Sequence, residues 1–166
     1  MICPVCHWEN FLGEDVCGNC GADLWGADTP TGATSFQGRL LGMSLDELRA
    51  PAPAVVDAEA SAVETVNRMR RDSIDCLLVM DGEALVGIFT DRDAILKVTG
   101  PGASEQTVRD VMTPDPVILR RGDPVAVAIN KMAVGGFRHV PIVDGAEPIG
   151  VISARDVFRH LAAGLR

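Results

Sequence analysis

Residues 87–93 read Gly87-Ile88-Phe89-Thr90-Asp91-Arg92-Asp93, and residues 150–156 read Gly150-Val151-Ile152-Ser153-Ala154-Arg155-Asp156. The two phrases lie 63 positions apart, and the same offset aligns residues 44–97 with residues 107–160 without a gap. A repeat of this length is a structural unit in itself. We therefore expect two copies of one small unit, arranged as a pseudo-symmetric pair with a cleft between them.

Each copy predicts the order strand, helix, strand, strand, helix, preceded by a capped helical turn. Residues 76–80 and 139–143 are short apolar strands, and Asp-Gly turns at residues 81–82 and 144–145 return the chain as hairpins. Met69 and Met132 fall on the apolar faces of the preceding helices and are expected in the core. Asp123-Pro124 reads as a cap followed by proline at the first helical position. The prediction is a mixed α/β (α+β) fold.

Two further segments complete the repeated phrases: residues 110–114, Asp-Val-Met-Thr-Pro, and residues 138–144, Arg-His-Val-Pro-Ile-Val-Asp. In combination these motifs resemble the cystathionine-β-synthase (CBS) domain pair, also called a Bateman module, over about residues 44–163. The resemblance implies tandem CBS domains at 44–106 and 107–166 that bind an adenosine nucleotide such as AMP, ADP or ATP. It also implies a homodimer that stacks through the helices.

The resemblance assigns roles to particular residues. Thr90 or Ser153 would add a hydroxyl to a phosphate, and the carboxylate of Asp93 or Asp156 is expected to be free for the ribose hydroxyls. From the residues alone, a hydroxyl helix cap with an acid at the third helical position is an equal alternative. The full set of ligand-binding residues that we predict is Thr90, Asp93, Ser153, Asp156, Arg138, His139, Ala54, Val117 and Thr113.

Two aligned positions differ in charge between the copies. Arg138 and His139 align with Asp75 and Cys76. The resemblance implies that these positions approach the phosphates. We therefore expect a cation beside Asp156, an anion beside Asp93, and phosphorylated ligands to bind first at the Asp156 site. The resemblance also implies that Ala54 and Val117, which follow the repeated prolines, contact adenine; otherwise they are plain core residues. Cys76 itself reads as a small buried hydrophobic residue.

The N-terminal segment carries the other four cysteines, as two CxxC pairs made of Cys3, Cys6, Cys17 and Cys20. Two such knuckles complete a tetrahedral sulfur shell, which indicates a zinc ribbon over residues 1–26, with iron as the alternative metal and two disulfides as the alternative chemistry. A segment this small needs a metal in order to fold, so the ion is predicted to be structural. Residues 27–43, rich in Gly, Thr, Ser and Pro, predict a linker.

Composition narrows the function. The net charge is −8, and residues 1–44 carry a single base, Arg39, against five acids, which disfavours nucleic acid as a partner. No apolar run reaches the ~20 residues of a membrane span, and no signal segment is recognisable, so a cytoplasmic protein is expected. No catalytic nucleophile paired with a general base can be assembled from these residues. This favours a ligand-sensing regulator with a protein partner over an enzyme. The alternatives are a zinc-ribbon regulator that binds nucleic acid and an adaptor with an empty cleft.

Overall fold

The computed structural model describes residues 2–3, 5–11, 15–24, 42–48 and 50–163. The chain divides into two compact units, Met1–Gly42 and Met43–Arg166. Residues 25–41, which include most of the predicted linker, lie outside the described residues. Within the described part, no helix is long and apolar enough to cross a bilayer.

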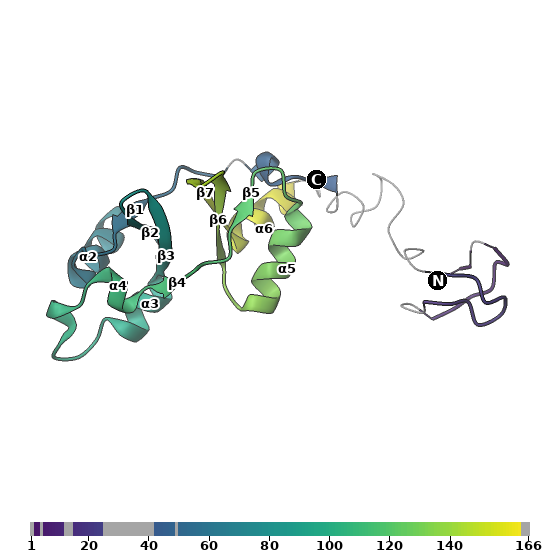
Figure 1. Cartoon of the computed structure of the whole chain (residues 1–166), viewed down its shortest axis with the longest axis horizontal. Helices are drawn as coiled ribbons and strands as arrows, with labels where there is room; N and C mark the ends of the chain where they lie inside the picture. The colour runs from purple at the N-terminus through teal and green to yellow at the C-terminus, as the bar shows by residue number, and fades with distance from the viewer. Residues whose placement is uncertain (1, 4, 12–14, 25–41, 49, 164–166) are drawn as a thin grey trace. The chain divides into compact units, whose positions relative to one another are not determined.

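The second unit contains the two predicted repeats in order (Figure 1). The first repeat comprises η1 (Leu45–Leu48), β1 (Val55–Asp57), α2 (Ala62–Asp72), β2 (Cys76–Asp81), β3 (Ala84–Thr90) and α3 (Asp91–Lys97). A short turn, η2 (Ala103–Glu105), precedes the second repeat. The second repeat comprises α4 (Val108–Val111), β4 (Thr113–Pro114), β5 (Leu119–Arg120), α5 (Val125–Gly135), β6 (His139–Asp144), β7 (Glu147–Ser153) and α6 (Ala154–Ala163). This confirms the predicted mixed fold of two repeated units.

Two sheets carry the helices, with strand orders β1-β2-β3-β4 and β5-β6-β7. In each sheet the first strand pairs parallel with the second, and the next two strands form an antiparallel hairpin. Gly82 and Gly145 close the hairpins with φ of +59° and +61°, a conformation that glycine adopts without strain. The hairpins also share a register shift, at Val79/Met80 and Ile142/Val143. The pseudo-symmetry therefore extends to the irregularities of the strands.

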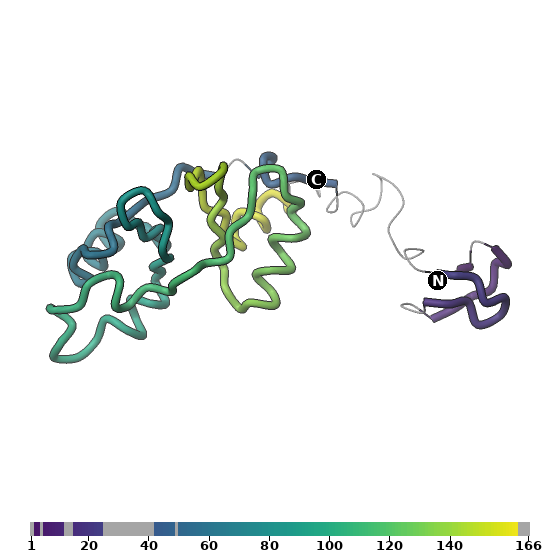
Figure 2. Tube along the Cα trace, viewed as in Figure 1, coloured from purple at the N-terminus to yellow at the C-terminus, as the bar shows by residue number. Residues whose placement is uncertain are grey.

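The start of each repeat packs on the other repeat, and Figure 2 shows the chain passing between them. At the start of the first repeat, the Leu45 N–H donates to the carbonyl of Asp123 at 2.9 Å. At the start of the second, the Val108 N–H donates to the carbonyl of Ala60 at 2.9 Å, and β4 joins the sheet of the first repeat beside β3. The two repeats are thereby interlocked.

The repeated glycines Gly87 and Gly150 lie where these exchanged segments cross the hairpins. A Cβ atom at Gly87 would lie 2.3 Å from the sulfur of Met112, and one at Gly150 would lie 2.7 Å from the Cβ of Ala50. Both distances are shorter than any van der Waals contact. Glycine at these positions therefore allows the segments before β4 and β1 to approach the sheets.

Apolar helix faces and capped ends explain most helix boundaries. Met69 and Met132 are buried as predicted, and Ser61 caps α2 by accepting a hydrogen bond from the Glu64 N–H. The expected cap of α5 at Asp123 is wrong. Pro124 takes the cap position without a side-chain hydrogen bond, because the Asp123 carboxylate instead accepts from the Arg120 N–H at 2.7 Å and closes the preceding turn.

The described part of the first unit consists of two similar turns, each containing one CxxC pair. The His7 N–H donates to the carbonyl of Cys3, and the Gly21 N–H donates to the carbonyl of Cys17, both at 2.9 Å. His7 and Gly21 hold the same left-handed conformation, with φ of 59° and 70°. His7 thus occupies a backbone position that favours glycine.

Candidate functional site

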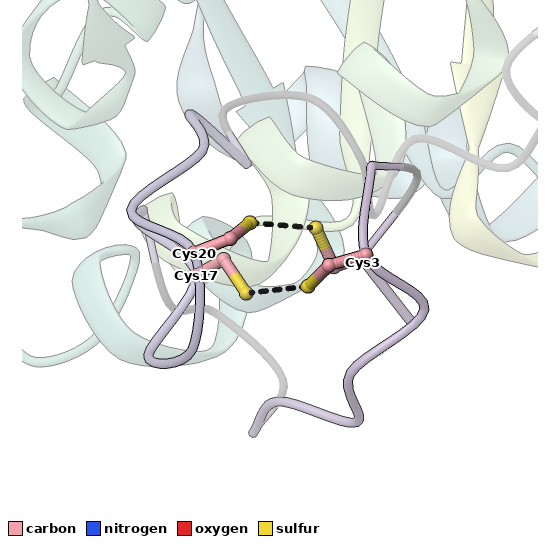
Figure 3. A group of neighbouring side chains, drawn as sticks. Cys3, Cys17 and Cys20 are labelled. Carbon is pink, nitrogen blue, oxygen red and sulfur yellow. Dashed lines mark hydrogen bonds between the residues drawn. The ribbon is translucent and has the colours of Figure 1, made fainter.

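The four N-terminal cysteines form a compact cluster of sulfur atoms (Figure 3). Their ligand atoms all lie within 4.8 Å of one another. The Cys3–Cys20 and Cys6–Cys17 sulfur pairs are each 3.7 Å apart, and none of the cysteines forms a disulfide. A tetrahedron with Zn–S bonds of about 2.3 Å has edges of about 3.8 Å. The geometry therefore fits one tetrahedral metal ion held by four sulfurs.

Local donors favour the thiolate form, which metal binding requires, at two of the four cysteines, Cys6 and Cys17. The backbone N–H of Cys20 is the main cause that lowers the pKa of the Cys17 thiol to about 6. The side-chain amide of Asn19, at 3.6 Å from the Cys6 sulfur, is the main cause that lowers the pKa of Cys6. His7 is exposed and is not a member of the cluster.

The second unit contains a cavity of about 410 Å³ that is lined by both repeats. Its walls come from β3, α3, β4 and the segment that follows it, the end of α5, and the start of β6. The volume lies in the range of small-molecule sites. Six of the nine predicted ligand-binding residues line it: Thr90, Asp93, Thr113, Val117, Arg138 and His139. Ser153, Asp156 and Ala54 are not part of its lining.

The Asp93 carboxylate at this cavity is fully engaged. Its Oδ2 accepts from the Thr90 N–H at 3.0 Å and from the Thr90 hydroxyl at 2.7 Å. Its Oδ1 accepts from the Thr113 hydroxyl at 3.1 Å and from Lys97 Nζ at 2.7 Å. The expectation of a carboxylate free for ribose is therefore wrong here, because a carboxylate has about four acceptor positions and four donors fill them.

The same donors fix the charge of Asp93. Burial by itself raises the pKa of this carboxyl, but the hydrogen bonds from Lys97 and Thr90 outweigh burial and hold the pKa below its ordinary value. Thr90 also accepts from the Asp93 N–H at 3.3 Å, which completes a capping box. The helix-cap alternative is thus realised in the first repeat, at the start of the seven-residue helix α3.

The equivalent carboxylate of the second repeat is less engaged. Asp156 Oδ2 accepts from the Ser153 N–H at 2.9 Å and from the Ser153 hydroxyl at 2.6 Å. Its Oδ1 has no hydrogen-bond partner among the described residues. The 63-residue offset gives Ala50 as the counterpart of Thr113 and His160 as the counterpart of Lys97. The two sites therefore differ in the donors on one carboxylate oxygen.

Arg138 and His139 reach toward the first repeat. Arg138 Nη2 lies 3.7 Å from Asp91 Oδ1, and His139 Nε2 lies 3.6 Å from Asp75 Oδ2. Both residues line the cavity that contains Asp93. Their backbones also adjoin the start of α6, because His139 pairs with Ser153 and the Arg138 carbonyl accepts from the Ala154 N–H at 2.8 Å. Their expected place beside Asp156 stays a prediction.

Val117 differs from its counterpart Ala54 in its backbone. The carbonyl of Ala54 accepts from the Leu78 N–H at 2.9 Å. The residue equivalent to Leu78 is Pro141, which has no N–H. The Val117 carbonyl accordingly has no hydrogen bond among the described residues, so it is available at the cavity as an acceptor.

Lys97, Arg92 and Asp91 also line the cavity and were not among the predicted site residues. The spacing of Asp93 and Lys97, four residues apart on one helix, is a readable signal for a pair of this kind. Cys76 is buried as predicted, and burial is the main cause that raises the pKa of its thiol to about 12.

Comparison with known proteins identifies relatives of the second unit. The family model described as CBS domain matches residues 45–100 and 108–163. The CBS domain-containing protein CBSCBSPB5 of Arabidopsis thaliana is 36% identical over 113 residues, covering 66% of this chain and 20% of that protein. The meiotically up-regulated gene 70 protein of Schizosaccharomyces pombe is 33% identical over 115 residues, covering 68% of this chain and 15% of that protein. The chain thus spans a fifth or less of the length of these relatives.

Solved structures share the fold. The Arabidopsis thaliana protein CBSX2 in complex with AMP superposes with a TM-score of 0.65 at 22% identity, covering 75% of this chain and 100% of that one. The CBS domain pair of protein MJ0100 in complex with 5′-methylthioadenosine and S-adenosyl-L-methionine superposes with a TM-score of 0.66 at 23% identity, covering 75% and 98%. At these identities the likeness is one of fold.

Proposed function

Because the chain belongs to the CBS domain family, we propose that Met43–Arg166 is a regulatory module that senses adenosine nucleotides. The domains would be a ribbon at 1–26, a linker at 27–43, and CBS domains at 44–106 and 107–166. The observation that carries the proposal is the cavity of about 410 Å³ between the repeats, which combines an apolar wall with hydroxyls, carboxylates and cations. The adenosine ligands named for CBSX2 and the MJ0100 pair support it.

Each part of an adenosine nucleotide has a complementary group in this cavity. Ile88 and Val117 offer apolar surface to the base, and the available Val117 carbonyl would accept from the adenine amino group. Thr90 and Asp93 would bind the ribose and Arg138 would bind the phosphate, and all three residues line the cavity. Phosphate would then bind beside Asp93 rather than beside Asp156.

The proposal assigns no reaction to the chain. The Thr90 hydroxyl donates to Asp93, and the lowered pKa of that carboxyl makes it a weak base. The hydroxyl and the carboxylate serve as a helix cap and as a binding surface. A regulatory role also agrees with the family, and the effect on a protein partner would come from a ligand-dependent change between the repeats.

The sulfur cluster would hold one structural zinc ion, with iron as the alternative. Four thiolates complete a tetrahedral shell and leave no open position for a substrate. The described part of the first unit contains no Lys or Arg, which counts against nucleic acid as its partner. We assign to the ribbon the role of contacting a protein partner. We also propose that the protein is cytoplasmic.

A homodimer through the CBS helices is part of the proposal. Three large apolar side chains on α3 and α6 are well exposed: Ile95, Leu96 and Phe158. Burial of such side chains contributes about 1.5–3 kcal/mol each when they are fully covered. We propose that a second copy of the module covers these three side chains, because CBS pairs stack through their helices.

A thermal-shift titration tests the proposed function. AMP, ADP, ATP and S-adenosylmethionine are titrated against the full chain, with GMP as the control for a generic anion. A ligand at a hundred times its Kd adds about 2.7 kcal/mol to the stability, which gives a clear rise in Tm. A rise with AMP but not with GMP supports the proposal. No rise with any adenosine compound leaves the adaptor with an empty cleft.

A further inference from the structure

Lys97 occupies the acceptor that a ribose would use. Its Nζ lies 2.7 Å from Asp93 Oδ1 and 3.2 Å from the carbonyl oxygen of Met112. The Lys97 side chain is 41% exposed, whereas that of Asp93 is 9% exposed. The ammonium group therefore covers a buried carboxylate from the solvent side, and Lys97 and Asp93 both line the cavity.

A ribose diol can reach Asp93 only if one of its four donors leaves. The two donors from Thr90 belong to the helix cap, and the Thr113 hydroxyl is held by the pairing of β4 with β3. Lys97 differs because its donor is at the end of a long, flexible side chain. It is therefore the donor that a ligand displaces most easily.

The displaced ammonium group needs a new anion. A nucleoside displaces Lys97 from Asp93 and offers no charge in return, whereas a nucleotide brings a phosphate into the same cavity. Arg92 and Arg138 also line this cavity, so with Lys97 it offers three cations to a phosphate. The exchange leaves both the ammonium and the phosphate paired.

We propose that Lys97 is a specificity-determining residue that moves from Asp93 to the ligand phosphate, so that the cavity selects phosphorylated adenosine compounds over adenosine. This inference rests on the proposed function, because it names the ligand class of the same cavity. The second repeat provides an internal contrast. With Ala50 and His160 at the equivalent positions and Asp156 Oδ1 unpartnered among the described residues, a ribose there displaces no lysine.

Calorimetric titration of AMP and of adenosine into the full chain measures the selectivity directly. Lys97→Met keeps the length of the side chain and removes its charge. We expect AMP to bind about tenfold more weakly, and adenosine to bind equally well or more tightly, since charged hydrogen bonds contribute about this much. Lys131→Met, at an exposed position on α5, makes the same change in net charge and should leave both affinities unchanged.

A second variant separates selectivity from loss of structure. Lys97→Arg keeps a cationic donor four residues after Asp93, so the ratio of AMP to adenosine affinity should stay close to the wild-type value. If Lys97→Met weakens AMP and adenosine equally, the ion pair is only structural and the inference is wrong. An unchanged ratio in Lys97→Met also overturns it. If the wild-type chain binds neither ligand, the proposed function itself fails.

Discussion

Arg138→Ala should weaken AMP binding and leave adenosine binding nearly unchanged. At about 8 Å and an effective dielectric of about 20, one charge pair contributes about 2 kcal/mol. The Arg138 side chain is 67% exposed and already near Asp91, so solvent and salt reduce this by half or more. The expected loss is about 1 kcal/mol, or roughly fivefold in Kd.

The assay is calorimetry with AMP and adenosine at low and high salt. Arg71→Ala is the matched control, because its side chain is 70% exposed, forms an ion pair with Asp72, and lies on α2 outside the cavity lining. It should leave both affinities unchanged. The difference between AMP and adenosine in Arg138→Ala should shrink as salt rises, because the contribution is electrostatic.

One result would refute the assignment of phosphate to the Asp93 cavity. If Asp156→Ala removes the tight AMP event while Arg138→Ala and Asp93→Ala retain it, the functional site is built on Ser153 and the sequence-based assignment was right. Loss of the event in Asp93→Ala alone is insufficient support, because that change also removes the capping box of α3. The exposed Arg138 is therefore the more informative position.

Three further outcomes are expected. Purified protein should contain one metal ion per chain by elemental analysis, and less than half an equivalent would contradict the metal site. The Cys17→Ser variant should lose the metal, while the Tm of Met43–Arg166 stays constant. The lowered pKa of Asp93 means that its stabilising charge is present above the ordinary value of 3.8 and is lost as pH falls through the lower folded value. Tm should therefore fall below about pH 4, and less so in Asp93→Asn. Deletion of residues 1–39 should leave a dimer by light scattering, and a monomer at tens of micromolar would exclude assembly through the CBS helices.

Local signals made the elements predictable from the sequence. The Asp-Gly turns, the buried methionines and the capped helical turns are all set by residues close together in the sequence. The predicted cap of the second repeat is formed by Thr107 and Asp110. The failed cap at Asp123 shows the limit of such signals. An aspartate before a helix can cap either the helix or the preceding turn, and the choice depends on the turn geometry.

The site was less predictable because its residues meet through tertiary contacts. The 63-residue offset aligns Arg138 with Asp75, but alignment does not say which cleft a side chain enters. That depends on the exchange of η1 and β4 between the repeats, which no local pattern encodes. The Thr113 hydroxyl likewise reaches Asp93 from twenty residues away, whereas Lys97 was recognisable from its i,i+4 spacing.

The contacts of Lys97 also indicate how a ligand would alter the arrangement of the repeats. Its Nζ ties α3 to the Met112 carbonyl, just before β4, and Thr113 in β4 ties the same strand to Asp93. A phosphate that captured Lys97 would remove one of these two connections between α3 and the segment that leads into the second repeat. In the bound state Lys97 would contact the phosphate instead of Asp93 and the Met112 carbonyl. A ligand shifts the population of two conformations only if its contacts differ between them, and this exchange would supply such a difference. The nucleotide-free and nucleotide-bound modules would then differ at β4, where the two repeats interlock.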